Sequence, residues 1–257
     1  LNRWSESRNM VYEMIDAMPD NPIELVKAYV ASGIFPGASF AIVNGSDVQK
    51  HVYGYNRLKP EPVLLQADMA YDLASVSKVV GTGTLMINLI LSGKVGLDDL
   101  LTTHYPEFEG SGGASLTIRQ LLTHTSGIDP FIKNRNTLPY NALRTALNQV
   151  AVTADKTFHY TDVNFILLGF MLETIYAQDL ADILQEQVFT PFKMIHTGFT
   201  APDRTVATAW DLPQGLVHDP KAQILGRHTG SAGLFSDLDD LAAFAQAYFA
   251  HPAYLAL

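Results

Sequence analysis

Ser75 and Lys78 are the two residues of this sequence whose types and spacing are best suited to chemistry. The segment Leu73–Gly93 is predicted to be a helix, and residues three apart on a helix share a face, so the Lys78 ammonium can reach the Ser75 hydroxyl. The start of a helix also offers unpaired backbone N–H groups and the positive end of the helix dipole. These groups suit an oxyanion that forms when a serine attacks a carbonyl carbon. The pattern therefore predicts a serine nucleophile for acyl transfer.

Lys78 is the only charged residue between Leu73 and Gly93. A free lysine is protonated at pH 7, and burial among uncharged, apolar residues disfavours that charged form. Lys78 is therefore a candidate base for Ser75. The spacing fits equally well a lysine that extends to solvent or pairs with an acidic residue such as Asp72.

Other chemical motifs are excluded by their spacing. No GxSxG sequence is present, and the glycines near Ser111 and Ser231 are wrongly placed for a nucleophile elbow. Gly81 and Gly83 follow no strand and precede no GK[ST], so they indicate close helix packing and not a phosphate loop. His218 and His228 lack a third clustered ligand, and no HExxH occurs. We expect neither a metal nor a cofactor.

The composition restricts the partners. The chain has 257 residues, 47% of them hydrophobic, with 17 Lys+Arg against 26 Asp+Glu and a net charge of −9. This acidic balance makes nucleic acid an unfavourable partner, and the absence of cysteine excludes disulfides and thiol nucleophiles. No apolar run reaches the roughly 18 residues that a membrane span needs. We expect a small-molecule or peptide substrate, and nothing indicates an oligomeric state.

The chain begins at Leu1 without a signal-peptide pattern. A cytoplasmic location is slightly favoured over secretion with a signal outside the given chain.

Local patterns predict several elements. Pro22 and the apolar spacing of Ile23–Val30 indicate an N-terminal helix. Two β-branched runs, Ala38–Val43 and Val48–Tyr55, flank Asn44 and Gly45 and indicate a hairpin.

Helices are also predicted later in the chain. Thr117 and Gln120 form a capping box, and Ser236 with Asp239 predicts a cap for a helix over Leu241–Tyr248. A further helix is expected from Tyr160 to Ile175.

Long stretches between Pro36 and Ala250 resemble the serine β-lactamase-related hydrolases, which include class C β-lactamases, D-alanyl-D-alanine carboxypeptidases and esterases of the same fold. The stretches that carry the resemblance are PGASFAIVNG (36–45), DLASVSKVVGTGTLMINLILSGKVGLDD (72–99), YPEF (105–108), LTIRQLLTHTSGI (116–128), FHYTDVNFILLG (158–169), QEQVFTPFKMIHTGF (185–199) and GSAGLFSDLDDLAAF (230–244).

The resemblance implies an α/β, or α+β two-lobed, fold of the β-lactamase/penicillin-binding-protein transpeptidase type. Residues 1–73 would supply the helix and hairpin of the α/β lobe, and residues 74–257 a mainly helical lobe.

The resemblance also implies catalytic roles. Ser75 would be the nucleophile, Lys78 its base or base partner, and Tyr160 the first residue of a Tyr-x-Asn motif that moves protons to the leaving group. The expected function is hydrolysis of an ester, amide or β-lactam through a Ser75 acyl-enzyme. The alternatives are a binding module of this fold without turnover and, more weakly, a scaffold role.

Expected substrate-binding residues are Asp162, Asn164, Ser231 and Ala232. Asp162 occupies the position where the family usually has Asn, and an ionised carboxylate only accepts hydrogen bonds and would hold Lys78 protonated. Asn164 could supply the missing amide if the helix already includes Tyr160.

The family's third motif, Lys-Thr-Gly or His-Thr-Gly on a strand, is matched in letters by His228-Thr229-Gly230. Alternating apolar neighbours are missing there. We therefore expect His228 in a turn that leads to a helix, and the third motif and the closing strands beyond Leu257.

Overall fold

The computed structural model describes residues 21–256, so the part of the N-terminal prediction that concerns residues 1–20 lies outside the described residues. The chain separates into two compact units. Of the described residues, one unit contains those up to Ile42 together with Gln49–Ala67, and the other contains Val43–Val48 and those from Asp68 onward. Strand β4, Tyr71–Asp72, lies in the second unit and pairs within it.

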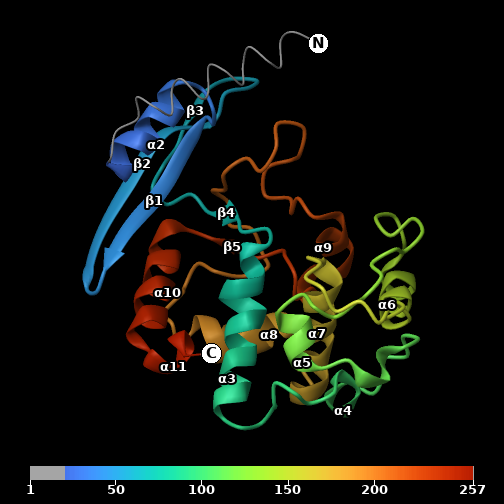
Figure 1. The fold of residues 1–257 in the computed structure, drawn as a ribbon. Helices are drawn as coiled ribbons and strands as arrows, with labels where there is room; N and C mark the ends of the chain where they lie inside the picture. The colour runs from blue at the N-terminus through green and yellow to red at the C-terminus, as the bar shows by residue number, and fades with distance from the viewer. Residues whose placement is uncertain (1–20, 257) are drawn as a thin grey trace. The chain divides into compact units, whose positions relative to one another are not determined.

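The first unit contains helix α2, Pro22–Ala31, strand β3, Val63–Leu64, and most of strands β1, Gly37–Asn44, and β2, Asp47–Arg57, without their connecting tip. The strands pair in the order β1-β2-β3 (Figure 1). The predicted N-terminal helix and hairpin are both confirmed. Asn21 caps α2 by accepting from the Ile23 N–H at 2.9 Å. Gly54, at φ +79°, leaves no space for a Cβ, which would lie 2.7 Å from a methyl carbon of Val30 in α2.

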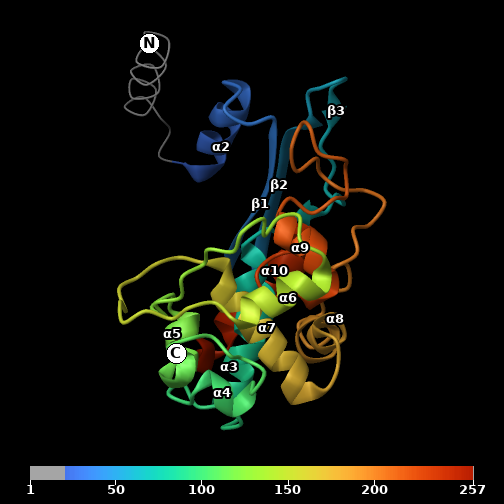
Figure 2. The same ribbon diagram turned by 90° about the vertical axis from the view of Figure 1, so that its right-hand side faces the viewer.

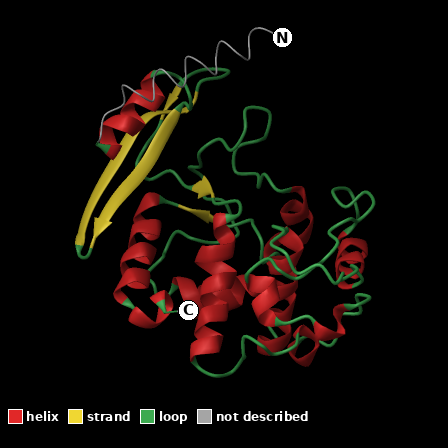
Figure 3. Cartoon of the chain, viewed as in Figure 1, coloured by secondary structure: helices red, strands yellow, loops and turns green. Residues whose placement is uncertain are grey.

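The second unit is mostly helical, with two short strands, β4 and β5, that pair antiparallel (Figure 3). Strand β5 is Phe235–Ser236. The helices are η1 Lys78–Gly83, α3 Thr84–Leu91, α4 Leu101–His104, η2 Gly113–Ser115, α5 Ile118–Leu122, α6 Tyr140–Asn148, α7 Asp162–Tyr176, α8 Leu180–Leu184, η3 Gln185–Phe189, α9 Pro220–Leu225, η4 Gly226–His228, α10 Leu238–Ala250 and α11 Pro252–Leu255.

Helix α7 forms the centre of the second unit. Every residue from Val163 to Leu172 is buried, as expected for a helix that is apolar on all sides. It contacts η1, α4, α5, α6, α8 and η4, and Figure 2 shows it surrounded by other helices of the unit. Within residues 21–256, none of the helices combines the length and the apolar character needed to cross a membrane.

The ends of the helices partly match the predictions. Thr117 and Gln120 form both hydrogen bonds of the capping box before α5, which confirms that prediction. The predicted cap at Ser236 is wrong. Asp237 caps α10 instead, its carboxylate accepting from the Asp240 N–H at 2.9 Å, because Ser236 belongs to β5 and its hydroxyl contacts Thr197 at 2.7 Å.

The segment Thr229–Leu234 packs against α7 through two glycines. A Cβ on Gly230 would lie 2.1 Å from the carbonyl oxygen of Phe165 and 3.1 Å from the Cα of Gly169. The Gly230 carbonyl in turn accepts from the Thr82 hydroxyl at 2.8 Å. The absence of side chains at this crossing therefore sets how closely the segment approaches α7 and η1.

We predict that Gly230→Ala lowers the free energy of unfolding by about 2–3 kcal/mol, because the added methyl group collides with backbone atoms that cannot rotate away. Urea denaturation checks this. Gly198→Ala is the matched control, since a Cβ there meets nothing within 4 Å. A Gly230→Ala protein as stable as the wild type would contradict the prediction.

Candidate active site

Ser75 follows β4 through a strained turn. Ala74 has φ +43°, in the left-handed region that L-residues seldom adopt, and such strain is concentrated at functional sites. The turn is held by the Ala74 N–H, which donates to Asp72 Oδ1 at 2.9 Å. The Ser75 side chain is exposed, and its backbone N–H has no acceptor among residues 21–256. The turn thus presents a hydroxyl and a backbone donor at one place.

Lys78 is buried, at 3% exposure, and its Nζ has three hydrogen-bond acceptors. It donates to Ser75 Oγ at 2.9 Å, to Asp162 Oδ1 at 2.8 Å and to the Ser231 carbonyl oxygen at 2.9 Å. An ammonium has three N–H groups, so each is satisfied. The predicted contact between Ser75 and Lys78 is present. Of the alternatives, a solvent-exposed lysine does not apply, whereas pairing with an acidic residue does occur, with Asp162 as the partner.

Asp162 is the first residue of α7, and its carboxylate lies between two lysines. Oδ1 faces Lys78, and Oδ2 lies 3.2 Å from Nζ of Lys221. Burial by itself would raise the pKa of Asp162, but the hydrogen bonds and charges of both lysines outweigh it and hold that pKa below its ordinary value. Asp162 is therefore a carboxylate at neutral pH.

Lys221 is a residue of this site that the sequence reasoning missed. It is 7% exposed, and its Nζ also lies 2.8 Å from Asp219 Oδ2. A signal was present in the sequence: Asp219 and Pro220 are typical of a helix start, and a lysine in a first helical turn faces the positive end of the dipole. Such an unfavourable position indicates that the lysine has a specific anionic partner.

Tyr160 lies next to Lys78, with Nζ 5.0 Å from the centre of its ring. The residue is half exposed. It precedes α7, because Thr161 is extended and caps the helix by accepting from the Val163 N–H at 3.3 Å. The prediction that the helix starts at Tyr160 is therefore wrong by two residues.

His124 is a second residue that sequence reasoning missed. Its ring lies 4.4 Å from the Tyr160 ring, centre to centre. Its Nδ1 lies 3.3 Å from the Thr161 backbone nitrogen and 3.0 Å from the Asn164 amide nitrogen. Both of these groups are donors, so Nδ1 is the acceptor. Burial, and then the charge of Lys78, lower the pKa of His124. A neutral His124 therefore supports the Tyr160 ring.

Asn164 does not take the role of substitute amide. It is fully buried, and its oxygen accepts from the Ser126 hydroxyl at 2.7 Å while its nitrogen contacts His124. The physical reason is the start of α7 after Tyr160, which removes the helical i, i+4 relation between the two residues. Asn164 thus connects α7 to the segment that contains His124 and Ser126.

Ser231 and Ala232 are buried, at 0% and 3% exposure, and do not present side chains to a substrate. The Ser231 hydroxyl lies 3.3 Å from the Thr229 hydroxyl, while its carbonyl accepts from Lys78. The segment is fixed by the Leu234 N–H, which donates to Ser77 Oγ at 3.2 Å. In this structure the segment therefore positions the lysine through its backbone.

His228 ends the short helix η4 and does not lie on a strand, as expected for a turn residue. Its Nδ1 lies 2.6 Å from Glu173 Oε1, in a charged cluster that includes Asp179. Ser75 is not among its partners in the described chain. The third-motif expectation for the chain beyond Leu257 stays a prediction.

With this geometry established, comparisons with known proteins identify the family. The family described as "Beta-lactamase" matches residues 23–256. The chain belongs to this family. A protein of Salmonella agona (strain SL483) described as "Putative D-alanyl-D-alanine carboxypeptidase" is 29% identical over 237 residues, which cover 76% of this chain and 54% of the relative. The chain thus spans about half the length of the curated relatives it matches.

Solved structures share the fold of this chain. A class C β-lactamase has a TM-score of 0.74 at 20% identity, and the matched region covers 90% of this chain and 65% of the β-lactamase chain. EstCE1, described as "a hydrolase with promiscuous acyltransferase activity", has a TM-score of 0.70 at 21% identity. The matched region covers 85% of this chain and 69% of the EstCE1 chain. The expected β-lactamase/transpeptidase-like fold is confirmed.

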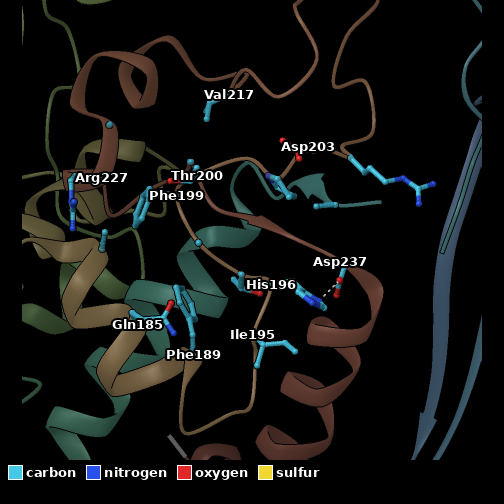
Figure 4. A pocket seen from close by; sticks show the side chains of 18 of the residues that line it. Gln185, Phe189, Ile195, His196, Phe199, Thr200, Asp203, Val217, Arg227 and Asp237 are labelled. Carbon is cyan, nitrogen blue, oxygen red and sulfur yellow. Dashed lines mark ion pairs between the residues drawn. The ribbon is translucent and has the colours of Figure 1, made fainter. Parts of the chain in front are cut away.

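A cavity of about 1010 Å³ is lined by residues of the second unit that include Gln185, His196 and Asp237 (Figure 4). Neither a serine nor a lysine is among the described residues that line it. Most of its charged residues pair with one another, as His196 does with Asp237 at 2.7 Å. The cavity therefore contains none of the predicted catalytic residues Ser75, Lys78 and Tyr160.

We predict that Asp162→Asn lowers the free energy of unfolding by about 2 kcal/mol at pH 7, because it leaves two buried lysines without their shared carboxylate. The folded-state pKa of Asp162 is depressed, so this stabilisation is present above its unfolded pKa and is lost as pH falls through the folded value. Urea denaturation should therefore show the difference between the two proteins shrinking from pH 7 to pH 3.

Exposed Asp203 provides the control for this pH dependence, because Asp203→Asn should differ little from the wild type at either pH. A difference between Asp162→Asn and wild type that stays constant with pH would contradict the assignment.

Proposed function

We propose that this protein is a serine hydrolase that cleaves an ester, amide or β-lactam through an acyl-enzyme on Ser75. The observation that carries the proposal is the 2.9 Å hydrogen bond between Ser75 Oγ, which is accessible, and Nζ of Lys78, which is buried. Membership of the Beta-lactamase family supports it. The relatives described as carboxypeptidases and the fold shared with β-lactamases and EstCE1 support this range of carbonyl substrates.

The partners of Lys78 determine how a proton can move. A carbonyl and a carboxylate oxygen only accept, so Ser75 Oγ is the one group of the three that can also donate. In the neutral state of Lys78 its lone pair must therefore face Ser75. The amine takes the hydroxyl proton as Ser75 Oγ bonds to the substrate carbonyl carbon.

The remaining steps follow from the same arrangement. The Ser75 N–H, which has no acceptor in the described chain, is placed to donate to the oxyanion. The resulting ammonium returns its proton to the leaving group as the carbonyl–leaving-group bond breaks. Tyr160, beside Nζ, is the group through which that proton would pass. Water then attacks the acyl-enzyme by the reverse proton path, which releases the acid and regenerates Ser75.

A binding module without turnover is the second candidate. The 2.8 Å ion pair between Lys78 and Asp162 favours it, because a carboxylate stabilises the protonated lysine and a protonated lysine cannot activate Ser75.

A fluorophosphonate probe separates the two candidates. We predict that Ser75 is labelled, because it combines an exposed hydroxyl with a lysine within hydrogen-bond distance. Intact mass followed by peptide mapping gives the site. Ser77, which is buried and accepts from the Leu234 N–H, serves as an internal control and should stay unmodified. An adduct at another residue, or none in the folded protein, would rule out the hydrolase.

We predict that Lys78→Arg reduces the labelling rate by at least about 100-fold, because a guanidinium cannot give up its proton near neutral pH. Stopped-flow labelling at pH 7.5 gives the rate, and circular dichroism confirms the fold. Lys133→Arg, at an exposed position, is the control and should react like the wild type. Wild-type rates in Lys78→Arg would show that Lys78 acts only as a fixed positive charge.

A further inference from the structure

Lys221 occupies an unusual position for a lysine. It lies in the first turn of α9, is buried, and places Nζ between the carboxylates of Asp162 and Asp219, at 3.2 and 2.8 Å. Burial of a charge is costly unless it is paired, so these two contacts are what keep the ammonium there.

The two lysines use different oxygens of Asp162. Oδ1 accepts from Lys78 and Oδ2 faces Lys221, so the carboxylate bridges them. Asp219 holds Lys221 from the other side, and its Oδ1 also accepts from the Ala222 N–H at 2.9 Å at the start of α9. Lys221 is thereby anchored to the backbone of its own helix.

Basic and acidic side chains alternate in this cluster. The contacts run from Lys78 to Asp162, from Asp162 to Lys221 and from Lys221 to Asp219. Among the described residues, His124 and Tyr160 are further titratable groups near Lys78, and burial together with the charge of Lys78 lowers the pKa of His124. When Lys78 loses its proton, Asp162 would face no cation if Lys221 were absent.

We propose that Lys221 is a positioning residue that keeps Asp162 paired when Lys78 is neutral, so that Lys78 can take the proton of Ser75. The inference rests on the proposed hydrolase function. It explains how a carboxylate can occupy the place of an amide without locking Lys78 in its protonated state. Lys221 acts through Asp162 and does not touch the substrate or Ser75.

The test is the rate of Ser75 labelling by a fluorophosphonate as a function of pH. Lys221→Gln keeps a hydrogen-bond donor and removes the charge. We expect the midpoint of the acid limb to move to higher pH by about one unit, because an unshared Asp162 holds the Lys78 proton more strongly. Lys221→Arg, which keeps the charge, should leave the midpoint near the wild-type value. Exposed Lys133→Gln, which removes one charge elsewhere, should also leave it unchanged.

A double-variant comparison tests the route through Asp162. In an Asp162→Asn background, adding Lys221→Gln should not raise the midpoint, since no carboxylate remains to be neutralised. If Lys221→Gln alone fails to fold, Lys221→Gln with Asp219→Asn removes the pair together and should show the same upward shift.

The outcomes are distinct. A wild-type protein that is not labelled on Ser75 overturns the hydrolase and this inference together. A labelled wild type with an unshifted Lys221→Gln profile overturns the inference alone. A loss of rate that is equal at every pH also overturns it, because that is the behaviour of a merely structural lysine.

Discussion

The burial of the Lys78 ammonium is the constraint on which the rest of this site depends. An unpaired charge in a protein interior costs several kcal/mol, so every N–H of the ammonium must find an acceptor. The acceptors come from three separate segments: the Ser75 turn, the start of α7 at Asp162 and the backbone at Ser231. The ammonium of Lys78 can therefore have all three hydrogen bonds only when these three segments of the helical unit are packed together.

This requirement accounts for several costly local features. Ala74 adopts a left-handed conformation so that Ser75 faces Lys78, and Gly230 lacks a side chain so that the backbone of Ser231 can approach. Asp162 provides a negative charge that an amide would not, and Lys221 offsets it. The site is thus a set of acidic and basic side chains that alternate and pair with one another.

Sequence patterns predicted the elements whose determinants are close together in the chain. The hairpin around Gly45, the cap at Thr117 and the Ser75–Lys78 pair all depend on neighbours within a few residues. One error arose where a distant contact competed with a local signal. The cap of α10 moved to Asp237 because β5 and Thr197 already engage Ser236, and neither partner is adjacent in sequence.

The sequence by itself indicated the contact between Ser75 and Lys78, the family resemblance and the helical regions that contain α2, α3, α5, α7 and α10. Only the tertiary structure decided which groups surround Ser75 and Lys78. Lys221 lies far from Lys78 along the chain, and Asn164 turned inward to His124 and Ser126 once α7 began after Tyr160. The physical reason is that helix starts and i, i+3 faces are set by short-range backbone hydrogen bonds, whereas the partners of a buried charge are chosen by whichever segments packing brings within about 3 Å.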